Sequence, residues 1–263
     1  MRSNFHTHSV YSDGSNTLEE LAASAIAQGF GALGFSEHSY TYFDESYCLS
    51  KENTPEYIAE VRYLKEKYCG KIDIYLGIEQ DFYSCEETTD YEYIIGSVHY
   101  VKKDGIFLPI DESAEDLAHF CAEYYGGDLY ALAEDYFQTV GMWAERKCDI
   151  IGHFDLITKF NEKYPLLDTD NPRYIKAAKD ALDKILAAGK IVEINTGAMA
   201  RGWRRSPYPE EKWLDYIIQR NGRLIPASDC HAQKDLAYGF DSTQMRKYAP
   251  YFVEFKPQIT HRS

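Results

Sequence analysis

Short apolar runs alternate with amphipathic stretches along the whole chain of 263 residues. The apolar runs are rich in β-branched and aromatic residues, which is typical of buried strands. We expect seven strands on this basis, at Ser3–Ser9, Ala32–Glu37, Ile72–Gln80, Tyr93–Tyr100, Asp149–Asp155, Ile191–Thr196 and Leu224–Asp229.

Between the expected strands, apolar residues recur with the period of a helix. Thr17 precedes one such stretch as a candidate N-cap, and Glu19 and Glu20 fall in its first turn, where carboxylates are favoured. Another stretch begins at Pro172 and is followed by Gly189, which are the usual start and stop residues of a helix. The expected helices are Leu18–Gln28, Thr54–Tyr68, Ala114–Tyr124, Leu129–Lys147, Pro172–Ala188 and Pro209–Arg220.

Strands that alternate with helices predict parallel β-α units. About seven such units in a chain of this length favour an α/β fold, a TIM-like (β/α)7 barrel made by a single domain over residues 1–263. A doubly wound open sheet is the alternative. Because barrel enzymes place their chemistry at the carboxyl ends of the strands, the residues there are the first candidates for function.

Six of the eight histidines fall at these predicted strand ends. The first strand ends in His6-Thr7-His8, and residues two apart on a strand share one face. The last strand ends with an acid and a histidine at the same spacing. The candidates at the strand ends are His6, His8, His38, Glu79, His99, His153, Asp229 and His231, with Asp13 in the loop after the first strand.

Imidazole and carboxylate groups together suit zinc, iron or manganese. Six imidazoles at one barrel mouth would be costly to gather without a ligand, so we expect a multinuclear metal site rather than a hydrogen-bonded mouth without metal. His119 lies in a helical pattern and His261 in the carboxyl-terminal tail, and both are expected to be structural or solvated. Strand alternation turns Cys230 away from its neighbours, which favours a packing role for this residue.

Composition limits the partners and the compartment. The formal net charge of −14 disfavours binding to nucleic acids and anionic membranes. It does not forbid a small anionic substrate, because local cations decide what a pocket binds. The amino terminus lacks the apolar core of a signal peptide, and no apolar run is long enough to span a bilayer. Six cysteines without a C-x-x-C pair indicate reduced thiols, and a cytoplasmic protein is therefore expected. The oligomeric state is left open.

The order of the strand-end motifs resembles the PHP family, the polymerase and histidinol phosphatase family. Phe5–Ser9 and Ser12-Asp13-Gly14 are similar to the opening signature of that family. Ile94–Val101 and Glu193–Ala198 are similar to its histidinol-phosphatase branch. The remaining motifs follow in the family order, as Glu37-His38, Gly77-Ile78-Glu79, Gly96–His99, Gly152–Asp155 and Asp229-Cys230-His231.

The resemblance implies a distorted seven-stranded barrel with a metal site at its mouth. It also implies two to three divalent transition-metal ions, which would be zinc, iron or manganese. By position in the motifs, His6, His8, Glu79 and Asp229 would surround the first metal, Glu79, His99 and His153 the second, and Asp13, His38 and His231 the third.

The resemblance implies a small phosphorylated metabolite as the partner. The implied reaction is hydrolysis of histidinol phosphate to L-histidinol and phosphate, a step of histidine biosynthesis. Two metals would lower the pKa of a shared water to about 7 and so supply hydroxide for attack on phosphorus. Glu79 and Asp229 would fix the metals, and Asp13 or a metal-bound water would protonate the leaving group. The cations expected at the phosphate are Arg201, Arg204, Arg205 and Lys159, and the acids expected at the substrate amine are Asp111 and Glu37.

Three alternatives stay open at the level of sequence. A metal-dependent amidohydrolase also opens with H-x-H on a barrel, although such enzymes usually bridge their metals with a carbamylated lysine and not with a residue like Glu79. A PHP enzyme could act instead on a phosphotyrosine protein or a nucleotide. A structural module without catalysis would be expected to lack a bridging ligand, and every matched ligand position is filled in this chain.

Overall fold

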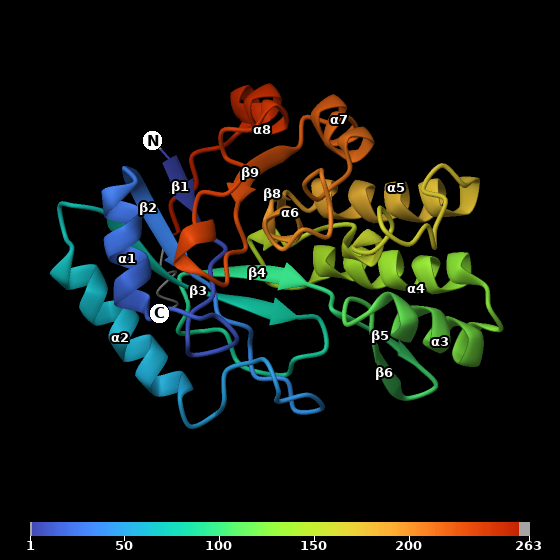
Figure 1. Cartoon of the computed structure of the whole chain (residues 1–263), viewed down its shortest axis with the longest axis horizontal. Coiled ribbons are helices and arrows are strands. Elements are labelled where there is room, and N and C mark those ends of the chain that lie inside the picture. The colour runs from blue at the N-terminus through green and yellow to red at the C-terminus, as the bar shows by residue number, and fades with distance from the viewer. Residues whose placement is uncertain (1, 258–263) are drawn as a thin grey trace.

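The computed structural model describes residues 2–257 of the chain. Its centre is a seven-stranded parallel sheet in the order β1-β2-β3-β4-β7-β8-β9, with helices packed around it (Figure 1). The strands are β1 (Arg2–Asn4), β2 (Phe30–Phe35), β3 (Asp73–Asp81), β4 (Tyr93–Ser97), β7 (Ile150–Ile151), β8 (Ile191–Asn195) and β9 (Arg223–Ala227).

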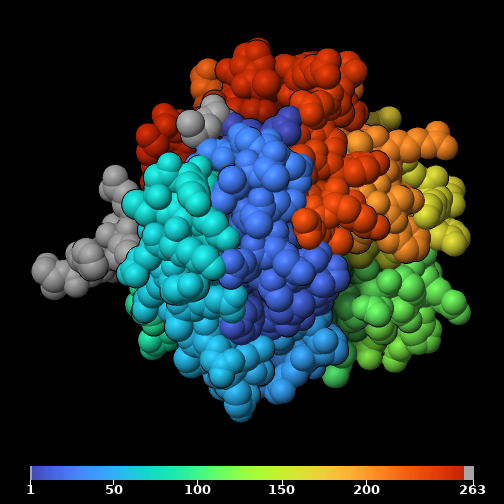
Figure 2. All heavy atoms as spheres, turned by 60° about the vertical axis from the view of Figure 1, so that its left-hand side comes forward, coloured from blue at the N-terminus to red at the C-terminus, as the bar shows by residue number. Residues whose placement is uncertain are grey.

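The two edge strands, β1 and β9, approach each other beyond their carboxyl ends. Thr7 and Cys230 form a single parallel bridge there, and the backbone N–H of His8 donates to the carbonyl of Cys230 at 3.0 Å. The first and last parts of the chain therefore lie against each other, as the blue and red segments do in Figure 2. The sheet is a nearly closed parallel barrel, which confirms the predicted fold class and not the open-sheet alternative.

The helices cover the outside of the barrel, and the expected caps form (Figure 1). The Thr17 side chain accepts from the N–H of Glu20, whose carboxylate accepts from the N–H of Thr17, so both make a capping box. The Asn171 side chain caps the helix that starts at Pro172. The helices are α1 (Leu18–Ala27), α2 (Thr54–Lys67), α3 (Ala114–Tyr125), α4 (Leu129–Met142), α5 (Pro172–Ala187), α6 (Gly197–Ala200), α7 (Glu211–Gln219) and α8 (Thr243–Tyr248).

The segment after β4 differs from the expectation. The predicted strand Tyr93–Tyr100 is two elements, because β4 ends at Ser97 and the chain then enters an antiparallel hairpin of β5 (Tyr100–Lys103) and β6 (Ile106–Pro109). Asp104 and Gly105 join these strands with φ angles of 49° and 85°. Asp-Gly is a common hairpin turn because both residues tolerate positive φ, so the sequence carried a signal for this hairpin.

Several element ends also differ from the prediction. Only Ile150–Ile151 of the predicted strand Asp149–Asp155 pairs in the sheet, and the predicted helix Leu129–Lys147 ends at Met142 before a 3-10 turn. Helices α6 and α8 were not predicted, because four and six residues are too few to display a helical period. No helix among residues 2–257 has both the length and the apolar character needed to cross a membrane.

Apolar side chains fill the barrel below its carboxyl end. Phe5, Tyr93, Ile95, Ile150 and Ile225 are buried in this interior cluster, which is separate from the larger layer between the sheet and the helices. The ring of Phe5 meets that of Tyr93 edge-on at 5.5 Å, and the Tyr93 hydroxyl donates to the carbonyl of Phe5 at 2.7 Å. This filled interior supports the polar residues at the barrel mouth.

Candidate metal centre

The bridge that closes the barrel also places four of the predicted ligands. Thr7 and Cys230 pair, and each has a ligand candidate on both sides, His6 and His8 on one strand and Asp229 and His231 on the other. Alternation turns these neighbours toward the barrel mouth while Cys230 packs in the core with 1% exposure. The packing role predicted for Cys230 is therefore confirmed.

A first cluster, here called the inner group, consists of Glu79 and the five imidazoles within 4.0 Å of its carboxylate, which are those of His6, His8, His38, His99 and His153. One Glu79 oxygen lies 3.2 Å from Nε2 of His6 and 2.9 Å from Nδ1 of His38. The other oxygen lies 2.9 Å from Nε2 of His153 and 3.5 Å from Nε2 of His99. The side chain of Glu79 is fully buried, so this carboxylate meets imidazoles and no bulk solvent.

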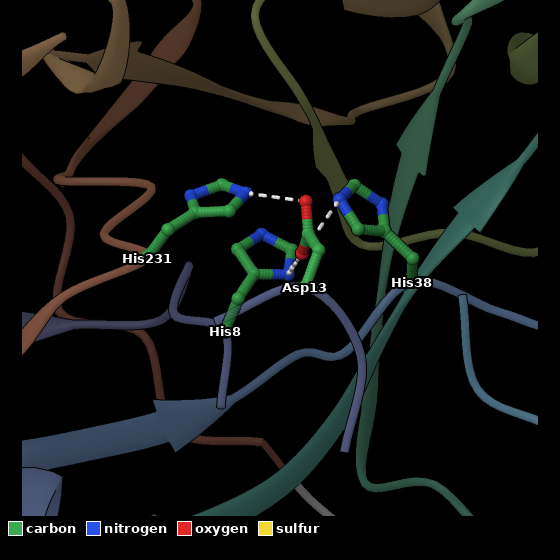
Figure 3. Close-up of side chains that lie close together, drawn as sticks. All are labelled: His8, Asp13, His38 and His231. Atoms are coloured by element: carbon green, nitrogen blue, oxygen red, sulfur yellow. Dashed lines mark ion pairs between the residues drawn. The ribbon is translucent and has the colours of Figure 1, made fainter. Parts of the chain in front are cut away.

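A second cluster, here called the outer group, consists of Asp13 and the imidazoles of His8, His38 and His231. Figure 3 shows the Asp13 carboxylate pointing into the space between the three rings. Its oxygens lie 3.1 Å from Nε2 of His231, 3.7 Å from Nε2 of His38 and 3.9 Å from Nδ1 of His8. His8 and His38 belong to both groups, because each has one ring nitrogen facing Asp13 and the other facing Glu79.

Asp229 lies between the two groups. One of its carboxylate oxygens is 3.3 Å from Nε2 of His8 and 3.7 Å from Nε2 of His6. The other oxygen accepts a hydrogen bond from Nη2 of Arg201 at 3.1 Å. Arg201 also donates to Nδ1 of His231 at 3.0 Å, so this arginine contacts two ligand candidates directly.

These side chains fit metal ions. Sets of donors within 4.8 Å of one another combine His8, Asp13, His38 and His231, then His6, His8 and Glu79, and then His38, Glu79 and His99. Several of the buried donor atoms lack a hydrogen-bond partner among residues 2–257, and unpaired buried polar atoms are costly. These atoms are His6 Nε2, both ring nitrogens of His8, Glu79 Oε2, and Nδ1 of His99 and His153.

The charges of the inner group are strongly coupled. Burial raises the pKa of Glu79, but the imidazoles of His6 and His38 outweigh burial and hold this pKa well below its usual range. Burial lowers the pKa of His99, but the carboxylates of Glu79, Asp81 and Asp111 together outweigh burial and raise this pKa to about 9. His8 behaves in the opposite way, because burial and the charge of His38 lower its pKa to about 3.

Sequence reasoning missed Glu193, which supports the inner group from the next layer. Its carboxylate lies 2.9 Å from Nδ1 of His6 and accepts hydrogen bonds from the backbone N–H of His153 at 2.8 Å and from the side chain of Asn195 at 2.7 Å. A carboxylate behind a ligating histidine fixes its ring orientation and tautomer. The available signal was an acid inside the apolar strand Ile191–Asn195.

A cavity of about 300 Å³ opens over both groups. Arg201 and Lys159, which are two of the four predicted phosphate ligands, line it together with Asp111. The Nζ of Lys159 donates to the carboxylate of Asp111 at 3.0 Å and to its carbonyl at 2.7 Å. Sequence reasoning did not name the other polar side chains of the wall, which are Asp44, Ser46, Tyr47, Tyr100 and Glu112.

The structure places the remaining candidates outside this cavity. Arg204 is buried and Arg205 is exposed, and neither side chain lines the cavity. Glu37 is also buried elsewhere, where its carboxylate accepts from the N–H of Ser9 at 3.0 Å. His119 is solvated and pairs with a glutamate one helical turn away, whereas His261 lies outside the described residues.

Comparisons with known proteins define the class. The PHP domain family matches residues 4–197 of the chain. A Deinococcus radiodurans protein named "Probable histidinol-phosphatase" is 32% identical over 85% of this chain and 84% of its own length. The chain therefore belongs to the PHP family, as its motifs indicated.

Two solved structures share the fold. A Listeria monocytogenes protein assigned as a histidinol phosphatase has a TM-score of 0.80 at 20% identity, over 92% of this chain and 100% of that one. Histidinol phosphate phosphatase of Lactococcus lactis, solved with zinc, L-histidinol and phosphate, has a TM-score of 0.71 at 19% identity, over 97% and 96% of the two chains.

Proposed function

We propose that this chain is a metal-dependent phosphomonoesterase that hydrolyses histidinol phosphate to L-histidinol and phosphate. The observation that carries the proposal is the pair of carboxylate-centred imidazole groups at the floor of a cavity that also holds Arg201 and Lys159. The name of the Deinococcus relative and the ligands of the Lactococcus structure support this substrate.

Two to three divalent transition-metal ions would occupy the site, with zinc the first candidate. The inner group and Asp229 would hold the more deeply placed ions, and the outer group would hold the third. When bound, such ions supply Lewis acidity toward phosphate oxygens and acidify water. The surrounding imidazoles keep the buried Glu79 carboxylate anionic and fixed in place, which is what a bridging ligand requires.

Arg201 and Lys159 would bind the phosphate. Arginine offers a planar fork for a phosphate, whereas lysine acts as a point charge. Arg201 is held by Asp229 and His231, so its guanidinium is fixed at the edge of the metal centre before substrate arrives. Lys159 is held by Asp111, and the phosphate would lie between the two cations.

The acidic wall of the cavity would bind the cationic end of the substrate. Asp44, Asp111 and Glu112 line it in addition to the acids of the metal centre. The Tyr47 ring lies 4.9 Å from that of His38 and provides an aromatic face beside the metal centre. A primary ammonium and an imidazole are both suited to carboxylates and to an aromatic surface.

Asp13 serves better as an anionic ligand than as the acid for the leaving alkoxide. Burial raises its pKa, but the imidazoles of His38 and His231 outweigh burial and hold the pKa below the usual range. A carboxyl group of this kind carries no proton to donate near neutral pH. Water at the metal centre remains the candidate proton donor.

A phosphate-release assay with a panel of phosphomonoesters tests the proposal. Histidinol phosphate should exceed p-nitrophenyl phosphate in kcat/KM by about 10²-fold or more, since only the former offers an amine to the acidic wall. Asp111→Asn should reduce this ratio by about tenfold, which corresponds to one charge-assisted hydrogen bond. Equal kcat/KM values for the two substrates in the unmodified enzyme would contradict the substrate assignment and leave the phosphatase chemistry intact.

A further inference from the structure

A buried polar cluster lies behind the metal centre, between the loop after β7 and the loop after β8. Asp155 and Arg204 are its charged members, with exposed fractions of 0% and 6%. The Asp155 carboxylate accepts from the backbone N–H of Glu210 at 2.9 Å, and the Arg204 guanidinium donates to the hydroxyl of Thr158. Each charged side chain therefore reaches from its own loop to the other one.

Three aromatic residues complete this cluster. The guanidinium of Arg204 lies 4.3 Å from the centre of the Tyr208 ring, and the rings of Tyr174 and Trp213 are 6.2 Å apart. Unpaired polar atoms are costly in a buried site. Five atoms of the cluster have no hydrogen-bond partner within residues 2–257, namely Asp155 Oδ1, Arg204 Nε, the hydroxyls of Tyr174 and Tyr208, and Nε1 of Trp213.

The two charges are close but not in direct contact. Burial lowers the pKa of Arg204, but the charge of Asp155, which is the largest of the opposing effects, together with Tyr208 and Glu210 outweighs burial and raises the pKa. In the described part of the chain, however, no nitrogen of Arg204 pairs with an oxygen of Asp155 within 4.0 Å. Buried donors and acceptors without protein partners are the usual partners of a buried water, which makes about three hydrogen bonds.

We propose that ordered water fills this cluster and that Asp155 and Arg204 are positioning residues for the two halves of the active site. Asp155 follows His153, whose Nε2 lies 2.9 Å from Glu79. Arg204 follows Arg201, which contacts Asp229. The cluster thus fixes the distance between the metal ligand His153 and the phosphate anchor Arg201. Arg204 acts in this way and does not contact the phosphate directly. The catalytic part of this inference rests on the proposed function, and the structural part does not.

Amide hydrogen exchange tests the structural part without any assay of activity. Asp155→Asn and Arg204→Met each keep the volume of the side chain and remove one charge. Each variant should speed exchange about tenfold or more in both loops, 153–158 and 201–210, including the loop that carries no substitution. Arg220→Met is the matched control, because Arg220 is an exposed arginine 3.4 Å from Asp183 on the protein surface.

The exchange pattern separates the outcomes. Faster exchange in both loops for either variant, with none for Arg220→Met, is the expected result. Faster exchange confined to the substituted loop would overturn the positioning role. If Arg204→Met does not fold, Tyr208→Phe removes a single hydroxyl of the cluster and should accelerate both loops by a smaller factor.

Kinetics with histidinol phosphate test the catalytic part. Asp155→Asn and Arg204→Met should each lower kcat about tenfold with little change in KM and with metal content retained, because the reacting groups are displaced but not removed. The kcat of the double variant should be no lower than that of the less active single variant, since both substitutions disrupt the same buried cluster. A rise in KM and in the phosphate inhibition constant for Arg204→Met alone would overturn the inference and make Arg204 a phosphate ligand. If the unmodified enzyme does not turn over histidinol phosphate while exchange stays coupled, the proposed function fails and the positioning role stands.

Discussion

The inner and outer groups use the same chemistry at different depths. The Glu79 side chain is fully buried, whereas that of Asp13 is 33% exposed and its partner His231 is 24% exposed. Charges interact more strongly where solvent is excluded, and exposed ion pairs contribute little to stability. The Glu79 carboxylate therefore interacts with its imidazoles alone among charged groups, while the Asp13 carboxylate also remains accessible to ions from the solution.

At the cavity the two carboxylates differ in the same way. Asp13 lines the cavity and Glu79 does not, although the rings of His99 and His153 in the inner group reach it. The difference teaches that one cluster of imidazoles and carboxylates can contain a part that holds the site together and a part that meets the ligand. Substitution of the two carboxylates one at a time is the direct way to separate these roles.

The largest effect is expected from Glu79→Gln. This change keeps the size of the side chain but removes the negative charge that faces five imidazoles, so more than one metal should be lost. The kcat for histidinol phosphate should fall by about 10³-fold or more. Elemental analysis of protein purified without chelator should find more than one transition-metal ion per unmodified chain and fewer in the variant.

Glu134→Gln is the matched control, because Glu134 is a half-exposed acid that pairs with Arg173 on the outer surface. It should keep both the metals and the activity. Full activity in a preparation free of metal, or in Glu79→Gln itself, would contradict the central role of the inner group.

A smaller effect is expected from Asp13→Asn. The loss of charge in the outer group should release one ion and lower kcat/KM by about 10- to 100-fold, because the inner group still binds its own ions. A chelator titration followed by elemental analysis should remove one ion early from the unmodified protein and the others late. Simultaneous loss of all ions in this titration would show that the two groups act as one site.

The smallest effect concerns protons. His99 has a pKa of about 9 in the metal-free protein, so it carries a proton at pH 7 that a metal must displace. Metal affinity should therefore rise with pH up to about 9, and each ion bound at the inner group should release protons below that pH. Calorimetry in buffers of different ionisation enthalpy measures the number released. A count that does not change between pH 7 and pH 10 would contradict this prediction.

The sequence carried most of the fold and of the ligand candidates because both depend on local patterns. Apolar runs and strand-end histidines are visible one segment at a time, and the closing motif from Asp229 to His231 follows the same alternation as His6 to His8. The hairpin after β4 was not predicted, because its short strands lie outside the barrel and its main signal is the two-residue turn at Asp104 and Gly105.

Contacts between distant loops could not be predicted in this way. Arg204 and Arg205 are neighbours in the sequence with the same chemistry, yet one is buried and the other is exposed. The hydroxyl of Thr158 and the charge of Asp155, which draw Arg204 inward, lie on another loop about 46–49 residues away in the chain. Glu193 was missed for a related reason. Its partners His6 and His153 lie on other parts of the chain, and they can be identified only from the arrangement of the strands.

Closure of the barrel by Thr7 and Cys230 has a consequence for synthesis of the protein. The ligand candidates span the chain from His6 to His231, so the complete set does not exist until His231 has left the ribosome. A nascent chain would hold His6 and His8 exposed while their partners after β9 are still absent. Maturation of the centre is thus expected to be a late event, in which metal uptake and the joining of the first strand to the last occur together.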